Sequence, residues 1–259
     1  MLSFNNIGNL GQLGNQMFQY AALCGMSEKI GTSCCCPYRF VVDEPIELAN
    51  CFLLGHALDH INEKVKFSYN ENSFSYSDSF CEIDPDGSVN IQGYFQSEKY
   101  FSHCRQLIKR QFTFKKNITD EVNEFIKNSD ICMDDFVSIH VRRGDYLNLF
   151  DYHTNLSDEY YLDAMKNFPD KKFMVFSDDI EWCRNSKIFD SVDVIYSDKN
   201  QFEDLCLMSM CSGHIIANSS FSWWGSWLSG NKTIAPAQWF GYKGPSNWND
   251  IYLSDWKVI

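Results

Sequence analysis

The sequence lacks an excess of positive charge. Its 259 residues contain 22 Lys and Arg against 34 Asp and Glu, which gives a formal net charge of −12. Nucleic acids and anionic membrane surfaces are bound through basic patches, so we expect no nucleic-acid partner. A small local pocket for one phosphorylated ligand remains compatible with this balance. The hydrophobic share of 44% is typical of a folded, soluble protein.

Long apolar runs are also missing. Runs such as residues 52–54 are far shorter than the ~20 residues that cross a bilayer. Residues 1–6 contain no basic region followed by an apolar one, as a signal peptide would. The sequence therefore predicts a cytoplasmic protein without a transmembrane segment.

The spacing of cysteine and histidine indicates no metal site. No two of the 11 cysteines stand at C-x-x-C spacing, and the adjacent residues 34–36 cannot pair easily with one another. We expect free thiols in a reducing compartment. His56 and His60 lack the intervening Glu of the zinc protease motif. Asp84 and Asp86 have the Asp-x-Asp form of metal-dependent glycosyltransferases, but the glycine that follows favours a turn.

Strands and helices alternate in the second half of the chain. Strands are expected at residues 136–141, 172–176, 192–196, 214–217 and 232–235. Helices are expected at 157–168, at 201–211 and from about 219. This alternation predicts an α/β fold with a parallel sheet.

The first half begins with a short strand, a glycine-rich loop at residues 8–14 and a helix. The loop lacks the Gly-x-Gly of the dinucleotide fingerprint, so we expect no nicotinamide site there, although a phosphate or sugar could approach its backbone. Residues 31–100 show no clear elements, and helices are expected near 97–110 and 120–127. A polar stretch at 129–135 suggests domains 1–132 and 133–259, with the last helix or strand free to cross back.

Three polar clusters follow successive predicted strands, at residues 140–145, 177–179 and 218–220. Parallel sheets bind ligands at the carboxyl ends of their strands, so the clusters predict one pocket. Arg142 and Arg143 offer forked donors for the oxygens of a diphosphate. Hydroxyl and N–H groups at a helix start near residue 219 suit the same anion.

Each cluster also has a simpler structural explanation. Two arginines after a strand can form a solvated edge, and Ser177–Asp178 and Asn218–Ser219 can cap helices. Trp223 and Trp227 share a helix face, which favours a place in the core over a sugar-binding platform.

Five blocks of the sequence resemble, in order, those of glycosyltransferase family 11, the α-1,2-fucosyltransferases. They are residues 14–21 (GNQMFQYA), 140–146 (HVRRGDY), 176–179 (FSDD), 203–208 (EDLCLM) and 216–225 (IANSSFSWWG). The likeness covers nearly the whole chain and is loosest over residues 31–100. Residues 9–12 lengthen the glycine loop relative to the family.

The resemblance implies a GT-B type α/β fold, with two compact Rossmann-like domains facing a cleft. The N-terminal domain would serve the acceptor and the C-terminal domain would bind GDP-fucose. The reaction would move L-fucose from GDP-β-L-fucose to O2 of a terminal β-galactoside, with inversion. The partners would be GDP-fucose and a galactose-terminated oligosaccharide, and a lipid-linked glycan would bring peripheral membrane contact.

The resemblance also implies roles for individual residues. Arg142 would hold the β-phosphate and neutralise the charge that develops as the bond to GDP breaks. Asp204 would read guanine N–H groups, and Asn15 would reach the donor from the other domain. The donor-binding set is Gly14, Asn15, Gln16, Arg143, Ser177, Asp178, Asp204, Asn218, Ser219, Ser220 and Phe221. Because a fixed arginine can replace a cation, we expect no metal and no other cofactor.

The general base and the exact reaction stay open. The catalytic set is Arg142, Asp145 and His140, with Asp145 as the favoured base. Asp145 could instead orient an arginine, or no side chain could act as base. Two alternatives to the α-1,2-fucosyltransferase hypothesis remain. One is transfer of fucose to another hydroxyl, or of another GDP-sugar, and the other is a non-catalytic nucleotide-sugar or glycan-binding protein.

Overall fold

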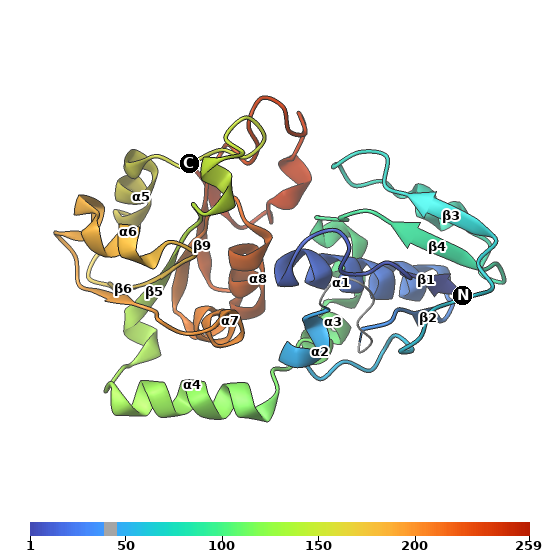
Figure 1. Ribbon diagram of the computed structural model, residues 1–259, viewed down its shortest axis with the longest axis horizontal. Helices are drawn as coiled ribbons and strands as arrows, with labels where there is room; N and C mark the ends of the chain where they lie inside the picture. The colour runs from blue at the N-terminus through green and yellow to red at the C-terminus, as the bar shows by residue number, and fades with distance from the viewer. Residues whose placement is uncertain (39–45) are drawn as a thin grey trace. The chain divides into compact units, whose positions relative to one another are not determined.

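The computed structural model describes residues 1–38 and 46–259, which form two compact units (Figure 1). The N-terminal unit consists of Met1–Lys115 and Asn247–Ile251, and the C-terminal unit consists of Lys116–Ser246 and Tyr252–Ile259. The chain therefore crosses back once into the N-terminal unit before it ends.

The two units divide before helix α4 (Lys116–Asn128), whereas the sequence suggests a boundary at residue 132. The buried side of α4 carries Ile118 and Val122, and the helix contacts α7 (Gln201–Met210) of the C-terminal unit. This packing assigns α4 to the C-terminal unit, although the polar stretch that suggested a boundary follows the helix.

The N-terminal unit contains a four-stranded sheet in the order β2-β1-β4-β3, whose pairings are parallel. The strands are β1 (Leu2–Ser3), β2 (Cys34–Cys35), β3 (Phe67–Asn70) and β4 (Val89–Gln92). Helix α1 (Leu13–Ile30) contacts β1 and β2 and runs alongside the sheet in Figure 1. The shorter helices are α2 (Leu48–Cys51) and α3 (Arg105–Gln111), with 3-10 turns η1 (Ser79–Glu82), η2 (Glu98–Tyr100), η3 (Ser102–Cys104) and η7 (Asn249–Ile251).

Helix α1 is buried along most of its length because its middle turns are apolar on nearly every side. Met17, Phe18 and Ala21 are among its fully buried residues. Gly31 ends the helix with a left-handed φ of 78°, and its N–H donates to the Ser27 carbonyl at 2.9 Å. The predicted opening of strand, glycine loop and helix is confirmed.

The C-terminal unit contains a six-stranded sheet in the order β10-β9-β8-β5-β6-β7, again with parallel pairings. The strands are β5 (Phe136–Val141), β6 (Lys172–Ser177), β7 (Val194–Tyr196), β8 (Gly213–Ile215), β9 (Lys232–Ala235) and β10 (Lys257–Val258). The helices besides α4 and α7 are α5 (Asp158–Met165), α6 (Ile180–Asn185) and α8 (Ser220–Ser229), with 3-10 turns η4 (Met133–Asp135), η5 (Asp145–Leu147) and η6 (Lys187–Phe189).

Helices cover both faces of this sheet, and β5 shows how the sequence allows it. Figure 1 shows α5 and α6 on one side and α7 and α8 on the other. Val137, Ile139 and Val141 join the apolar core with residues of α5 and α6. The alternate residues Ser138 and His140 are also buried, so β5 has no solvent-facing side.

The strands and helices predicted for the second half are confirmed, with small shifts at their ends. The sequence did not indicate β10, because it is two residues long and contains an exposed lysine. All 11 cysteines are free thiols. Within residues 1–38 and 46–259, no helix combines the length and the apolar character needed to cross a bilayer.

Candidate functional site

The strand order of the C-terminal unit places a topological switch point between β5 and β8. From β5 the chain proceeds to β6 and β7 on one side, and it then returns through α7 to β8 on the other side of β5. Open parallel sheets bind ligands at the carboxyl ends of the strands at such a point. Residues 142–145 and 216–220 occupy this position, and residues 177–179 follow the neighbouring strand β6. The three predicted clusters therefore share one edge of the sheet.

The Arg142 guanidinium lies between two carboxylates. Its Nη2 is 2.6 Å from Asp145 Oδ1, and its Nη1 is 3.1 Å from Asp178 Oδ2. The side chain retains 23% exposure, so the charged group is fixed yet reachable. A guanidinium held in one orientation is well suited to two-point binding of phosphate oxygens.

Arg143 is turned toward helix α6. Its Nε lies 3.2 Å from Asp179 Oδ2, and its guanidinium carbon stands 3.9 Å from the centroid of the Trp182 ring. Its backbone N–H donates to Asp178 Oδ1 at 2.9 Å. In this arrangement Arg143 fastens the loop after β5 to the start of α6, while Arg142 stays at the switch point.

Gly144 allows the loop after β5 to approach β6 closely. A Cβ at this position would lie 2.3 Å from Asp178 Oδ2, the oxygen that pairs with Arg142. Any larger residue would therefore displace the carboxylate that positions the guanidinium.

The polar residues after β6 mainly organise the start of α6. Ser177 Oγ accepts the Asp179 N–H at 2.9 Å, and Asp179 Oδ1 accepts the Trp182 N–H at 3.3 Å. Asp179 is the N-cap of the helix. Of the two donor-binding candidates here, Ser177 supports this cap and Asp178 buttresses the arginines.

Helix α8 begins at the switch point with polar groups. Ser219 is its N-cap, and the Ser219 hydroxyl oxygen accepts the Phe221 N–H at 3.3 Å. The first turn, beginning at Ser220, carries backbone N–H groups with no acceptor inside the helix. Such a helix start favours an anion.

Asn218, just before this helix, is buried and anchored. Its Nδ2 donates to the carbonyls of Thr154 at 2.9 Å and Trp239 at 2.8 Å. The backbone carbonyl of Asn218 accepts the Tyr146 hydroxyl at 3.1 Å, and the Tyr146 ring stacks on His153 with centroids 4.0 Å apart. These contacts tie the loop after β5 to the start of α8.

Unsatisfied polar atoms gather around Asn218. Over the described residues, four buried side-chain atoms have no hydrogen-bond partner: His153 Nδ1, Thr154 Oγ1, His214 Nε2 and Asn218 Oδ1. Three of the four belong to the residues just described. Most buried polar atoms in native proteins have a hydrogen-bond partner, so this small group stands out in the C-terminal unit.

His140 is a buried, neutral imidazole. Its Nδ1 lies 3.0 Å from Ser222 Oγ, and its ring centroid is 5.7 Å from that of Phe221. Burial, together with the Arg142 charge, lowers the pKa of His140 to about 3. So low a pKa makes the ring a poor proton acceptor near neutral pH.

Asp204 is half-buried on α7. The Ser197 hydroxyl donates to its Oδ1 at 2.5 Å. Burial above all raises the pKa of Asp204, the Ser197 hydrogen bond lowers it and the Glu203 charge raises it, and the net pKa is about 7. Its carboxyl group therefore changes charge within the physiological range.

The three remaining donor-binding candidates lie in the N-terminal unit, at the start of α1. Gln16 Oε1 accepts the Glu47 N–H at 2.8 Å, and Asn15 Oδ1 accepts from Gln96 Nε2 at 2.7 Å. Glu47 Oε2 in turn accepts the Leu13 N–H at 2.6 Å, so it satisfies one N–H of the first turn. Gly14, the third candidate, is buried in that turn.

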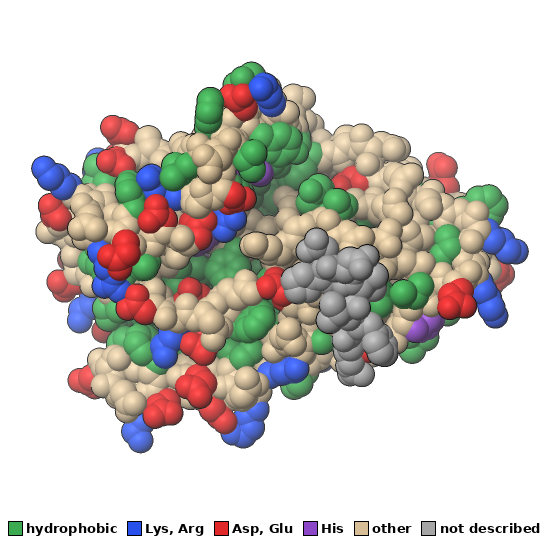
Figure 2. All heavy atoms as spheres, in the orientation of Figure 1, with side chains coloured by type: hydrophobic (Ala, Val, Ile, Leu, Met, Phe, Trp, Pro, Cys, Tyr) green, Lys and Arg blue, Asp and Glu red, His purple; other side chains and the backbone are tan. Residues whose placement is uncertain are grey.

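The structure adds three residues to the sequence-based site, namely Tyr146, Asp179 and Trp182. Tyr146 and Asp179 stand inside the recognised blocks at 140–146 and 176–179, so the sequence did carry a signal for them. Trp182 lies outside these blocks, and only its contact with the Arg143 guanidinium in the structure connects it to the site. On the face drawn in Figure 2, acidic side chains lie among basic ones, in keeping with the net charge of −12.

Comparisons with known proteins found similar sequences and similar folds. The chain is 35% identical to an alpha-1,2-colitosyltransferase of Escherichia coli over 89% of this chain and 90% of that protein. It is 25% identical to the mouse (Mus musculus) galactoside 2-alpha-L-fucosyltransferase Sec1 over 96% of this chain and 72% of that protein.

Solved structures of fucosyltransferases share the fold. The fucosyltransferase NodZ from Bradyrhizobium aligns with a TM-score of 0.60 at 13% identity, covering 95% of this chain and 96% of NodZ. POFUT1 in complex with GDP-fucose aligns with a TM-score of 0.52 at 12% identity, covering 94% and 96%. The α/β architecture of parallel sheets is thus that of the GT-B fucosyltransferases. The sequence model of glycosyl transferase family 11 matches residues 2–259, and the chain belongs to this family of glycosyltransferases.

Proposed function

We propose that this enzyme is an inverting α-1,2-fucosyltransferase, which moves L-fucose from GDP-β-L-fucose to O2 of a terminal β-galactoside. The observation that carries the proposal is Arg142, held between Asp145 and Asp178 at the switch point beside the start of α8. The relatives named as galactoside 2-alpha-L-fucosyltransferases support the acceptor, and the solved complex of POFUT1 with GDP-fucose supports the donor.

The leaving group is the diphosphate of GDP, and its developing charge is the main obstacle to the reaction. In the proposal, Arg142 binds the β-phosphate through its forked N–H groups, and Ser219, Ser220 and the first N–H groups of α8 bind the remaining phosphate oxygens. These donors are held in place before the reaction, so they stabilise the departing GDP without reorganising. The transfer then needs no metal ion.

The guanosine is assigned to the α7 and α8 side. Asp204 as a carboxylate accepts guanine N–H groups, and Phe221 lies near the base. The resemblance to the family also assigns Gly14, Asn15 and Gln16, at the start of α1, to donor binding. Arg143, Ser177, Asp178 and Asn218 maintain the loops that carry Arg142 and Ser219, as their hydrogen bonds suggest.

The ion pair of 2.6 Å between Asp145 and Arg142 favours an orienting role for Asp145 over that of general base. The buried, neutral His140 is likewise a weak acceptor, because its pKa lies at about 3. In the proposal no strong base acts, and the proton passes from galactose O2 to solvent water late, after the bond to GDP has largely broken.

GDP-colitose is a second candidate donor, because the chain is 35% identical to an alpha-1,2-colitosyltransferase. Colitose is fucose without its 3-hydroxyl group, so GDP-colitose presents the same diphosphate to Arg142. Choice between the two donors would rest on contacts to that one hydroxyl.

The test is incubation with GDP-fucose or GDP-colitose and with lactose or N-acetyllactosamine, with EDTA present during the short assay. Mass and linkage analysis of the product should show a new α-1,2-linked fucose. A product formed only with GDP-colitose would contradict GDP-fucose as the donor. A fucose on another hydroxyl of galactose would contradict the α-1,2 linkage. Binding of GDP-fucose with no product from any acceptor would leave only a binding protein.

A further inference from the structure

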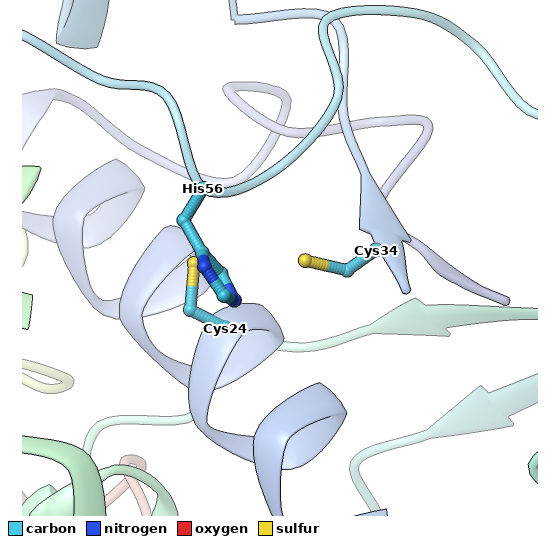
Figure 3. Close-up of side chains that lie close together, drawn as sticks. All are labelled: Cys24, Cys34 and His56. Atoms are coloured by element: carbon cyan, nitrogen blue, oxygen red, sulfur yellow. The ribbon is translucent and has the colours of Figure 1, made fainter. Parts of the chain in front are cut away.

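Two thiols and one imidazole meet in the N-terminal unit, although they are distant in the sequence (Figure 3). Cys24 comes from α1, Cys34 from β2 and His56 from the segment after α2. Their two sulfur atoms and one ring nitrogen all lie within 4.8 Å of one another. Zinc–sulfur bonds of ~2.3 Å in a tetrahedron place neighbouring ligand atoms about 3.8 Å apart. The cluster is therefore within about 1 Å of the spacing of a zinc site.

The backbone holds each of the three residues in place. Cys24 lies in the middle of the buried helix α1, and Cys34 pairs with Leu2 in the sheet. The Cys34 carbonyl accepts the Leu58 N–H at 2.9 Å. The His56 N–H donates to Gln111 Oε1 at 2.8 Å. A helix holds the backbone of Cys24, a strand holds that of Cys34, and a hydrogen bond to Gln111 holds that of His56.

A carboxylate stands beside the imidazole. Glu28 Oε1 lies 3.3 Å from His56 Nε2, and Glu28 follows Cys24 by one turn of α1. Histidines that bind metals commonly have such a carboxylate partner, which fixes the ring and strengthens it as a ligand. Two thiols with a histidine and a carboxylate form a more specific set than a thiol pair alone.

We propose that Cys24, Cys34 and His56 bind a zinc ion that links α1, β2 and the segment after α2. Sulfur and imidazole ligands select zinc over Mg²⁺ or Ca²⁺, which prefer oxygen ligands. As the two zinc–sulfur bonds form, each thiol releases its proton to solvent. A water molecule completes the tetrahedron, and Glu28 holds the His56 ring. The ion is structural, so the metal-free transfer proposed above does not depend on it for chemistry.

Zinc binding is tested by titrating the metal-free protein with Co²⁺. Bonds of Co²⁺ to thiolate sulfur give a charge-transfer absorption band in the near ultraviolet. One equivalent of Co²⁺ should produce the band, and Zn²⁺ should then displace it. One equivalent of Zn²⁺ should also raise the melting temperature. No band at stoichiometric Co²⁺, or a Cys24–Cys34 disulfide in protein purified under reductant, would overturn the proposal.

Variants separate this site from the other cysteines. Cys34→Ser and His56→Asn should abolish the band and the Zn²⁺-dependent rise in melting temperature. Glu28→Gln should weaken zinc binding about 10- to 100-fold. Cys81→Ser, at an exposed cysteine of the same unit, is the matched control and should change neither. His56 is partly exposed, with 24% of its side chain accessible, so its variant should fold without metal. A band that survives in both Cys34→Ser and His56→Asn would place the metal elsewhere and refute the assignment.

Discussion

At the scale of single residues, Arg142 carries the largest expected effect. Arg142→Ala should lower transfer by at least about 10²- to 10³-fold, the cost of removing one preorganised donor from a developing charge. Melting should stay close to that of the parent protein, because the side chain is partly exposed. Initial rates and thermal melts measure both. Arg184→Ala, which removes another arginine paired with an aspartate in the same unit, is the control. Near-normal turnover in Arg142→Ala would exclude the phosphate role.

Asp145→Asn distinguishes an orienting carboxylate from a general base. Loss of the 2.6 Å ion pair should free the Arg142 guanidinium, so both GDP affinity and rate should fall. A general base would instead lower the rate and leave GDP binding intact. Calorimetry with GDP, compared with steady-state rates, decides between the two roles.

Asp204 should make GDP binding pH-dependent. Burial raises the pKa of its carboxyl group to about 7, so the group is largely protonated at pH 6 and ionised at pH 8. If the carboxylate reads guanine, GDP affinity should rise about tenfold over this range, as one proton is lost. GDP changes its own charge near pH 6, so the matched reference is Asp204→Asn titrated with the same ligand. If GDP affinity changed with pH in the same way in the parent protein and in Asp204→Asn, Asp204 would not bind the guanine base.

At the scale of elements, the packing of α8 on α7 depends on Gly225. A Cβ at Gly225 would lie 2.8 Å from Met208 Cβ, an atom near the backbone that cannot move aside cheaply. Gly225→Ala should therefore destabilise the protein by about 1–3 kcal/mol, as overpacking does. Urea unfolding followed by tryptophan fluorescence measures it, since Trp223, Trp224 and Trp227 are buried in α8. Gly55→Ala, where a Cβ meets nothing within 4 Å, should be neutral.

The same element shows which sequence patterns were informative. Helix α8 and strand β5 were predicted because long apolar stretches with a polar start or end are strong signals. The strands β2 and β10 were not, because each has only two residues and depends on its neighbours for hydrogen bonds. Of the two predicted caps, Ser219 does cap α8, whereas α6 is capped by Asp179, the residue after the predicted Ser177–Asp178.

At the scale of the whole molecule, the C-terminal unit should lose stability in mild acid. Burial lowers the pKa of both His140 and His214 to about 3, against about 6.5 in an unfolded chain. Between these values the unfolded state binds more protons, so stability falls as pH falls, by up to about 1.4 kcal/mol per histidine and pH unit. His153, whose pKa burial also lowers, acts in the same direction.

Asp204 opposes this trend, because its folded pKa of about 7 lies above the unfolded value of 3.8. From pH 6.5 to 5 the protonation of Asp204 stabilises the folded state, and it offsets the loss of stability that about one histidine causes. Asp204→Asn should therefore lose stability more steeply with acid than the parent protein. Urea unfolding at a series of pH values, read by tryptophan fluorescence, measures both slopes. Stability that is flat from pH 6.5 to 5 in the variant would contradict buried neutral histidines.

The sequence alone determined the family, the alternation of strands and helices, and the clusters at the strand ends. These features depend on patterns among neighbouring residues, such as apolar runs, caps and continuous motifs like residues 140–146. Such patterns can be recognised without the tertiary structure. The tertiary structure decided what each polar group contacts. Asp178 beside Arg142 depends on the parallel pairing of β5 with β6, and the meeting of Cys24, Cys34 and His56 depends on the N-terminal sheet. Contacts between residues so far apart are set by strand order and register, and neither leaves a local mark in the sequence.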